Sequence, residues 1–469
     1  MTSRAARTGI GLLTAATFML FLDVTVVNVA LDRIGTELGG GLSALQWVLD
    51  AYTVALTVGL AGAGPLVDRY GAVPVAVVGV AVFTVASAAC ALAPTAGVLL
   101  AGRAAQGVGA AVVVPASLGL VAAVHPAGPA RSHAVALWSA IGAVALAVGP
   151  LVGGVLVQTA GWRSIFWLNV PVGVVVCGGL LAIRRSAPVA PHVPGRADVV
   201  GVVVLAAALL TAAVLVIEHV PPGPLGPALA VVVLVGAVTL LLRRGRGRPH
   251  AVLPTDLVTR SEVAVLLLLG GATFAGLYAF VFLVPLSDQA AFGRSALATG
   301  VAFLPLTVAL FAVGFVAGRL AERFPERLLV GGALLAMAAG TGLAVGVGLD
   351  PASPVRPVAL VLVGAGATLA LTPATIALLR LAGAPRAGVV TSTSNLVRNA
   401  GGVLGVALAG WAVHAGRPGA GPVPAGPDLV DRVGGALAAV AVALAVVAVA
   451  FLVACPPGLA RRVPRAEPA

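Results

Sequence analysis

Long apolar runs recur along the whole chain and constrain its fold more than any other feature. A helix needs about 20 predominantly apolar residues to cross the hydrocarbon core of a bilayer. Fourteen runs meet this requirement, near residues 9–31, 45–66, 73–93, 97–122, 133–159, 163–183, 198–217, 225–242, 262–286, 296–318, 328–349, 355–379, 387–412 and 433–455. With 60% hydrophobic and 9% charged residues, the chain has too little polar surface for a water-soluble protein. We therefore predict an all-α polytopic membrane protein with fourteen transmembrane helices.

The basic residues test this span map. All 28 are arginines, and the chain contains no lysine. If the N-terminus is cytoplasmic, 20 arginines fall in inner segments, 6 in outer segments, and Arg103 and Arg398 within spans. This bias follows the positive-inside rule for an even number of spans. The sequence thus predicts a multi-pass protein of the cytoplasmic membrane with both termini inside. Topology also explains the net charge of +12, so we expect no nucleic-acid partner.

Metal, disulfide and nucleotide chemistry find no support in the sequence. The three cysteines, Cys90, Cys177 and Cys455, lie in or beside apolar runs and show no C-x-x-C spacing. The phosphate-binding pattern G-x-x-x-x-G-K-[ST] requires a lysine, which the chain lacks. We therefore expect no metal, no cofactor and no enzymatic activity. An ion gradient is the expected energy source for any transport.

An internal repeat divides the chain into two halves. Gly64 to Gly71 recurs as Gly318 to Pro325, an offset of 254, and two further motif pairs recur at offsets of 257 and 255. Many transporters are built from such repeats around one central site. The predicted division is an N-terminal six-helix bundle in 1–183, two inserted spans in 184–261, and a C-terminal six-helix bundle with a short tail in 262–469.

Both copies of the first repeated motif place an acid and an arginine at the cytoplasmic end of a helix. We predict a cytoplasmic gate in which these charges pair in one conformation and separate in another. The alternative is a short polar turn that obeys the positive-inside rule and has no gating role. The candidate gate residues are Gly64, Asp68, Arg69, Gly71, Glu322 and Arg323.

Four motifs, in order and spacing, carry a resemblance to a known family. They are Leu22 to Leu31, Gly64 to Gly71, Arg103 to Ala110, and Gly142 to Gly154. Over nearly its whole length the chain resembles the major facilitator superfamily, and within it the fourteen-span drug:proton antiporter branch. The resemblance implies two six-helix bundles with two inserted spans, and export driven by protons. One departure is that Ala, Val and Pro follow Gly71, where the family usually has basic residues.

Three ionisable residues lie inside the predicted spans of the N-terminal half. At 1.5 Å per helical residue, Asp23, Asp50 and Arg103 lie about 12, 7 and 9 Å from the outer ends of their spans. Charges inside a bilayer are costly and usually mark ion or substrate pathways. We predict Asp23 as the coupling carboxylate, Arg103 as its tuning or relay partner, and Asp50 as a second proton or cation site. The alternatives are a structural pair for Asp23 and an interfacial residue near a helix start for Asp50.

The predicted fifth span carries a stripe of small residues. Gly142, Gly149 and Gly153 share one face of a helix, with Pro150 and Gly154 beside them. Glycine permits close approach of a neighbouring helix, and proline removes a backbone donor and favours a bend. We predict a close-packed antiporter helix between the halves. Ordinary small-residue packing is the alternative.

Polar residues within spans are candidates for the substrate cavity. They are Asn28, Gln106, Asn395 and Arg398. Each amide could bond a substrate or a neighbouring helix, and Arg398 could face the cavity or hold the C-terminal half together.

Together these features predict a monomeric, proton-coupled antiporter that exports amphipathic or cationic small molecules by alternating access. Its expected partners are a small-molecule substrate, protons and the lipid bilayer. Two alternatives are a dedicated exporter of one self-made antibiotic or metabolite and a non-transporting sensor or assembly partner. The residues name no particular substrate.

Overall fold

The chain forms a bundle of long helices. The computed structural model describes residues 3–39, 41–124, 129–184, 198–218, 224–248, 251–345, 348–382, 386–414, 426–456 and 459, and this part contains no strand. Thirteen helices within it are long and apolar enough to cross a membrane. The predicted fifth span lies in a further helix of 32 residues, whose described apolar portion is Val148–Ala160. The chain is therefore a multi-pass membrane protein, as predicted.

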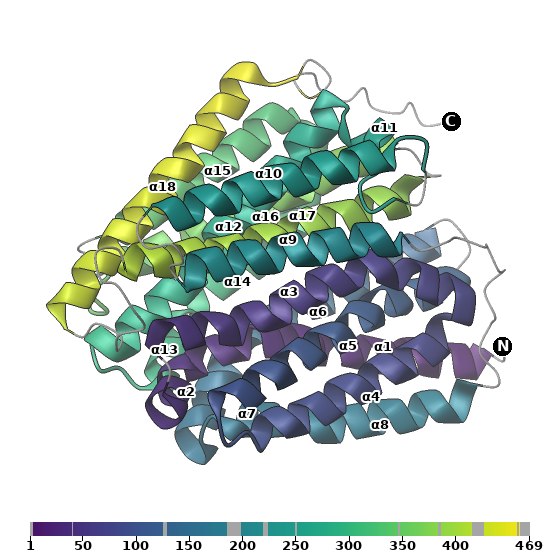
Figure 1. The fold of residues 1–469 in the computed structure, drawn as a ribbon, viewed down its shortest axis with the longest axis horizontal. Helices are drawn as coiled ribbons and strands as arrows, with labels where there is room; N and C mark the ends of the chain where they lie inside the picture. The colour runs from purple at the N-terminus through teal and green to yellow at the C-terminus, as the bar shows by residue number, and fades with distance from the viewer. Residues whose placement is uncertain are drawn as a thin grey trace.

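The N-terminal half supplies the helices drawn in purple and blue in Figure 1. They are α1 (Ser3–Val26), the 3-10 helix η1 (Val27–Ala30), α2 (Leu31–Leu38), α3 (Gly41–Tyr70), α4 (Ala72–Ala91), α5 (Ala96–Val124), α6 (Pro129–Ala160), α7 (Arg163–Trp167) and α8 (Asn169–Ile183). The end at which α1 begins is called the inner end below, and the end that carries α2 and α7 the outer end (Figure 1). The first span therefore changes from α to 3-10 geometry near its outer end.

The C-terminal half supplies the helices drawn in green and yellow. They are α12 (Ser261–Leu286), the π-helical segment η3 (Ser287–Ala291), α13 (Ala296–Ala302), α14 (Leu304–Arg323), α15 (Glu326–Leu343), α16 (Val355–Ala382), α17 (Ala387–His414) and α18 (Pro427–Ala454). The first long helix of this half, like that of the other, gives way to irregular helical geometry at its outer end.

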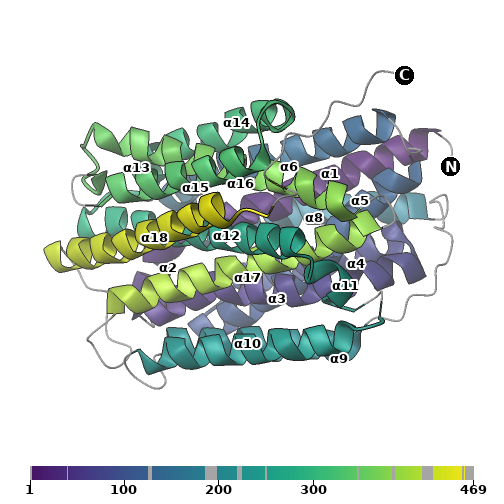
Figure 2. The ribbon, with the colours of Figure 1, turned by 90° about the horizontal axis from the view of Figure 1, so that it is seen from above.

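The inserted helices lie at one side of the molecule, as the view from above shows (Figure 2). Helix α9 (Val199–Ile217) packs against both α3 and α17, whereas α10 (Leu225–Gly245) packs mainly on α9 and exposes many apolar side chains, as a bilayer-facing helix does. The short helix α11 (Thr255–Val258) then leads into α12. Glu218, which caps α9, accepts hydrogen bonds from Trp47 Nε1 and Ser43 Oγ on α3. The insert thus covers a seam between the halves.

The two halves pack together towards their outer ends. On one side Gln46 of α3 donates hydrogen bonds to the carbonyls of Val406 and Ala407 on α17, each over 3.1 Å. On the other side α6 packs on α13, where a Cβ atom added to Gly154 would lie 2.7 Å from the Leu297 Cα. Because no larger side chain fits there without displacing backbone, Gly154 permits this close packing.

Candidate functional site

Asp23 lies at the centre of the N-terminal half and is fully buried. Its Oδ2 pairs with Arg103 Nη1 of α5 at 2.5 Å. Its Oδ1 accepts hydrogen bonds from Asn169 Nδ2 of α8 at 2.7 Å and from Gln106 Nε2 at 3.4 Å. Ser87 of α4 accepts hydrogen bonds from both amides. Four helices therefore converge on one carboxylate, and both of its oxygens have partners.

Arg103 connects this carboxylate to the middle of the molecule. Its Nε donates to the Val48 carbonyl at 3.0 Å, and its Nη1 also donates to Gln106 Oε1 at 2.9 Å. The guanidinium carbon lies 4.4 Å from the centre of the Tyr52 ring, a cation–π distance. Although Arg103 is only 1% exposed, it contributes to the wall of the central cavity.

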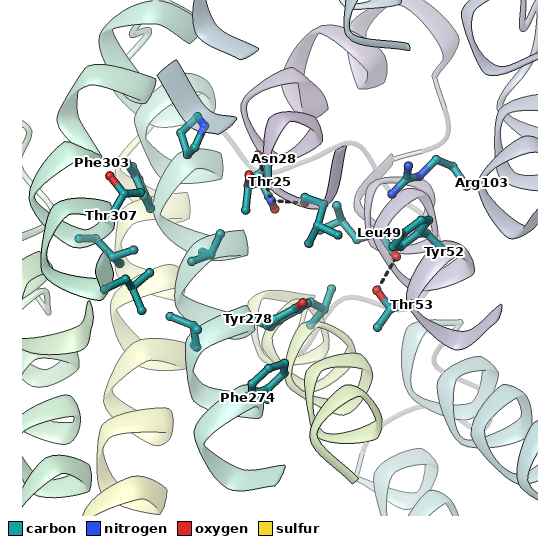
Figure 3. Close-up of a pocket in the computed structure, with 17 residues that line it drawn as sticks. Thr25, Asn28, Leu49, Tyr52, Thr53, Arg103, Phe274, Tyr278, Phe303 and Thr307 are labelled. Atoms are coloured by element: carbon teal, nitrogen blue, oxygen red, sulfur yellow. Dashed lines mark hydrogen bonds between the residues drawn. The ribbon is translucent and has the colours of Figure 1, made fainter. Parts of the chain in front are cut away.

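A cavity of about 850 Å³, including the part open to solvent, lies between the two halves (Figure 3). Its lining is mostly apolar, with polar groups contributed by threonines, tyrosines and Asn28. Tyr278 and Phe274 of α12 form a stacked pair with ring centres 5.5 Å apart, across the cavity from Tyr52 (Figure 3). Among the described residues that line it, Arg103 carries the charge. Such a chamber suits amphipathic molecules with aromatic or aliphatic parts.

Asp50 does not join the cluster of Asp23 and Arg103, although the depth estimate placed the three residues close together. It lies on α3 and is 1% exposed. Its Oδ2 has no hydrogen-bond partner within the described residues. Asp50 follows Gln46 by one helical turn, on the side of α3 that packs on α17 of the opposite half. Helix periodicity explains the difference, because Tyr52 and Thr53 occupy the cavity face of α3. Asp50 therefore stands at the contact between the halves.

The glycines of α6 fit against two different helices. A Cβ atom at Gly142 would meet the Phe21 ring, and one at Gly149 would collide with Thr25, both on α1. Added at Gly153, it would lie 2.6 Å from Val29 Cγ2 of η1. Gly154 instead faces α13, where the Pro150 carbonyl also approaches Gly300 closely. The stripe therefore packs α6 within its own half and brings it against the other.

The candidate gate residues occupy helix ends at the inner side. Gly71, with a φ of 85°, separates α3 from α4, and Arg69 stacks over the ring of Tyr70. Glu322 and Arg323 are exposed at the end of α14, and neither forms an ion pair with a described residue. The Gly64 and Asp68 positions lie outside the described side chains.

Near the end of α14, a different acid forms an ion pair. Glu326, the first residue of α15, is 3% exposed and pairs with Arg380 Nη1 of α16 at 2.8 Å. The repeat pointed to Glu322 because that residue aligns with Asp68, whereas Glu326 has no counterpart in the motif of the first half. Its position at the start of a helix, opposite the last turn of α16, could have indicated the pairing.

The four cavity candidates divide into three groups. Asn28 lines the cavity and donates to the Val24 carbonyl at 3.2 Å. Gln106 points into the Asp23 cluster. Arg398 lies in the C-terminal half, where its Nη2 donates to Thr375 Oγ1 at 2.6 Å, and Asn395 lies one turn before it; neither is among the cavity-lining residues described above.

Sequence reasoning overlooked a second buried acid and arginine. Asp288 of η3, which is fully buried, pairs through Oδ2 with Arg356 Nη2 of α16 at 2.5 Å. Both residues lie close to predicted span ends, where charges are ordinary, so neither stood out in the apolar pattern. No group of three or more His, Cys, Asp or Glu side chains in the described part of the chain could hold a metal ion.

Arg103 links the buried Asp23 carboxylate to the central cavity. Because one guanidinium contacts both, a change in the position of Arg103 would alter the surroundings of the carboxylate and the wall of the cavity together.

The sequence comparisons agree on one family. The model of the Major Facilitator Superfamily matches residues 13–406. The methylenomycin A resistance protein of Bacillus subtilis is 33% identical over 401 residues, covering 84% of this chain and 85% of that relative. The multidrug resistance protein Stp of Mycobacterium tuberculosis is 32% identical, covering 86% and 74%. The tetracenomycin C resistance and export protein of Streptomyces glaucescens is 32% identical, covering 84% and 73%.

Solved transporters share the fold. A bacterial homologue of the human lysosomal transporter Spinster, in an inward-facing and unoccupied conformation, superposes with a TM-score of 0.67 at 18% identity, covering 97% of this chain and 98% of its own. The peptide transporter POT in complex with sulfate gives a TM-score of 0.69 at 15% identity, covering 97% and 95%. At these identities the similarity establishes the fold.

Proposed function

The chain belongs to the Major Facilitator Superfamily, and from this premise we propose that it is a proton-coupled antiporter that exports amphipathic or cationic small molecules. The observation that carries the proposal is the position of Arg103, which pairs with the buried Asp23 and also lines the central cavity. A proton on Asp23 and a substrate in the cavity would therefore act on the same guanidinium.

The proposed cycle alternates between two arrangements of the halves. The packing of α3 on α17 and of α6 on α13 supports a state closed at the outer end. Movement of the halves would open that end and let a proton from outside reach Asp23. The neutral acid attracts Arg103 less strongly, so the guanidinium is free to change its position against Tyr52 and release the substrate. We place the protein in the cytoplasmic membrane as a monomer, with both termini inside.

The cavity supports the proposed class of substrate. Its lining is mainly apolar with a few polar groups, as in pockets that bind small organic molecules. Tyr52, Phe274 and Tyr278 offer aromatic faces to which a cation could bind. Threonine hydroxyls and Asn28 can orient a few polar groups of the substrate.

A test replaces Asp23 by Asn in protein reconstituted into proteoliposomes. We expect substrate movement driven by an imposed pH gradient to be lost, while exchange of substrate for substrate persists, because the amide keeps the shape but cannot carry the proton. Glu37→Gln is a matched control, since Glu37 pairs with Arg163 at the exposed outer surface. Unchanged proton-driven transport by Asp23→Asn would refute the coupling role.

A dedicated exporter of one antibiotic is the second candidate. Two relatives bear the name of a single compound, methylenomycin A or tetracenomycin C, whereas Stp is named for multidrug resistance. Susceptibility of cells that express the chain, measured against a panel of chemically unrelated antibiotics, separates the two. Protection against one compound alone would favour the dedicated exporter.

A further inference from the structure

The second acid and arginine pair lies directly behind the contact that closes the outer end. Asp288 belongs to the π-helical segment η3, and π-helical turns often mark functional sites. The Asp288 carbonyl accepts a hydrogen bond from the Arg294 N–H at 2.9 Å, and Ser295 then caps α13 by accepting from the Ala298 N–H. Only a short segment therefore separates the carboxylate from the helix that contacts α6.

The surroundings of Asp288 are incompletely bonded. Its Oδ1 has no hydrogen-bond partner among the described residues, although Asp288 is fully buried. The same holds for buried side-chain atoms on η3, the following loop, α13 and α16, namely Ser287 Oγ, Arg294 Nη1, Thr299 Oγ1 and Arg356 Nε. Leaving buried polar groups unpaired is costly, so such a cluster is expected to exchange partners during function.

Helix α13 connects this cluster to the other half. It contacts η3 and η1, and it packs on α6 at Gly154 and Pro150. A Cβ atom at Gly154 would lie 2.8 Å from the Ala296 carbonyl oxygen, so the contact tolerates little displacement. Interfaces packed this closely separate in discrete steps rather than gradually.

We propose that Asp288 is a second proton-binding site, located in the outer gate of the C-terminal half. Ionised Asp288 holds Arg356 and keeps α13 positioned against α6, so the outer end stays closed. Binding of a proton from outside converts the carboxylate to the neutral acid, weakens its attraction to Arg356, and favours opening. This role rests on the proposed transport function and adds a response to external pH that does not pass through Asp23.

The charged groups around Asp288 are consistent with this assignment. Arg356 pairs with it directly, and Arg294 is a second cationic residue nearby, whose backbone N–H donates to the Asp288 carbonyl. Helix α18, which also packs on η3, carries Asp428, Asp431 and Arg432 in its first two turns, and Arg432 pairs with Asp428. The ion pair that a proton would weaken is therefore the one with Arg356.

The test measures opening at the gate itself in whole cells. Ala296, which is buried against α6, is replaced by Cys in a variant whose Cys90, Cys177 and Cys455 are replaced by Ser, and a membrane-impermeant maleimide is applied from outside. Because the thiolate is the form that reacts and becomes scarcer as pH falls, labelling is expressed relative to that of an exposed cysteine placed at Thr36 and labelled at the same pH. We expect this relative labelling to increase as external pH falls, by up to about tenfold per pH unit, the limit for one linked proton. Asp288→Asn should give high labelling at every pH, and Asp288→Glu should restore the pH dependence.

Two controls keep this result separate from the coupling role of Asp23. Glu37→Gln removes an acid from an exposed outer pair and should label like the parent. Asp23→Asn should retain pH-dependent labelling even though it has lost proton-driven transport. If Asp288→Asn kept the pH dependence of its parent, the gate assignment would be wrong whatever Asp23→Asn shows. If Asp23→Asn instead transported normally, only the proposed coupling would fail.

Discussion

The two buried acid and arginine pairs occupy comparable places in the two halves but differ in their surroundings. Each joins the outer part of the half's first span to its fourth span, α1 to α5 through Asp23 and Arg103, and η3 to α16 through Asp288 and Arg356. Within each pair, the carboxylate oxygen and the guanidinium nitrogen lie 2.5 Å apart. Both carboxylate oxygens of Asp23 accept hydrogen bonds, whereas Asp288 Oδ1 accepts none from the part of the chain that the structure describes.

This contrast shows that ion pairing alone does not define a coupling site. Arg103 reaches the cavity, which is why we propose that Asp23 acts on the substrate, whereas the pair of Asp288 and Arg356 lies beside the segment that leads to the contact between α13 and α6. Similar charges on a repeated scaffold are therefore suited to different tasks. The role we propose for the second pair is control of opening, which the first pair does not duplicate.

The largest expected effect comes from removing either arginine. Arg103→Ala and Arg356→Ala each leave a buried carboxylate without its guanidinium, which costs about 3–5 kcal/mol of stability. The loss should be larger for Arg356→Ala, because Asn169 and Gln106 still donate to Asp23 whereas, among the described residues, no side chain other than Arg356 donates to Asp288. Thermal unfolding of the purified variants in detergent measures the difference.

A double variant checks the cause of that instability. Adding Asp288→Asn to Arg356→Ala removes the unpaired charge, so it should recover part of the lost thermal stability. Stability equal to that of Arg356→Ala alone would contradict a buried, unpaired carboxylate as the cause.

An intermediate effect is expected from Asn169→Ala, which removes the 2.7 Å hydrogen bond to Asp23. Loss of one buried bond to a charged group costs about 1–3 kcal/mol, so proton-driven transport should fall by about tenfold. Asn395→Ala is the matched control, because Asn395 does not contact the cluster. The comparison is made by initial transport rates in proteoliposomes, and equal rates for the two variants would show that Asn169 does not support the coupling site.

The smallest expected effects distinguish Glu326 from Glu322, two acids near the connection between α14 and α15. Glu326→Gln breaks a mostly buried pair with Arg380, whereas Glu322 is exposed and has no ion pair with a described residue. We expect Glu326→Gln to lower the unfolding temperature by a few degrees and Glu322→Gln to leave it unchanged. If Glu322→Gln lowered the unfolding temperature more than Glu326→Gln does, then the repeated motif, rather than Glu326, would supply the stabilising acid at this place.

Several features of the site were predictable from simple distances along helices. The depths of Asp23 and Arg103 placed them at similar levels, and the structure pairs them. The spacing of Gly142, Gly149 and Gly153 predicted one face of a helix, which packs along α1 and η1. Both predictions depend on the fixed rise and periodicity of an α-helix, which tertiary packing hardly changes.

Other features needed the tertiary structure. Depth placed Asp50 beside Asp23, but it lies instead at the contact between the halves, because depth carries no information on the direction of a side chain. The pairing of Asp288 with Arg356 depends on the π-helical turn and on how α16 meets it. A side chain's partners across helices depend on rotation about each helix axis, and packing decides that rotation.

The sequence by itself determined the membrane-spanning helical architecture, the repeat and the family, because hydrophobic length and local motifs leave few alternatives in a bilayer. The predicted orientation likewise depends on arginine counts alone. Only the tertiary structure decided which charges meet, which residues line the cavity, and where an unpaired carboxylate oxygen is buried. Those outcomes arise from contacts between residues far apart in the chain, and the energy of each contact depends on a geometry that no single helix specifies.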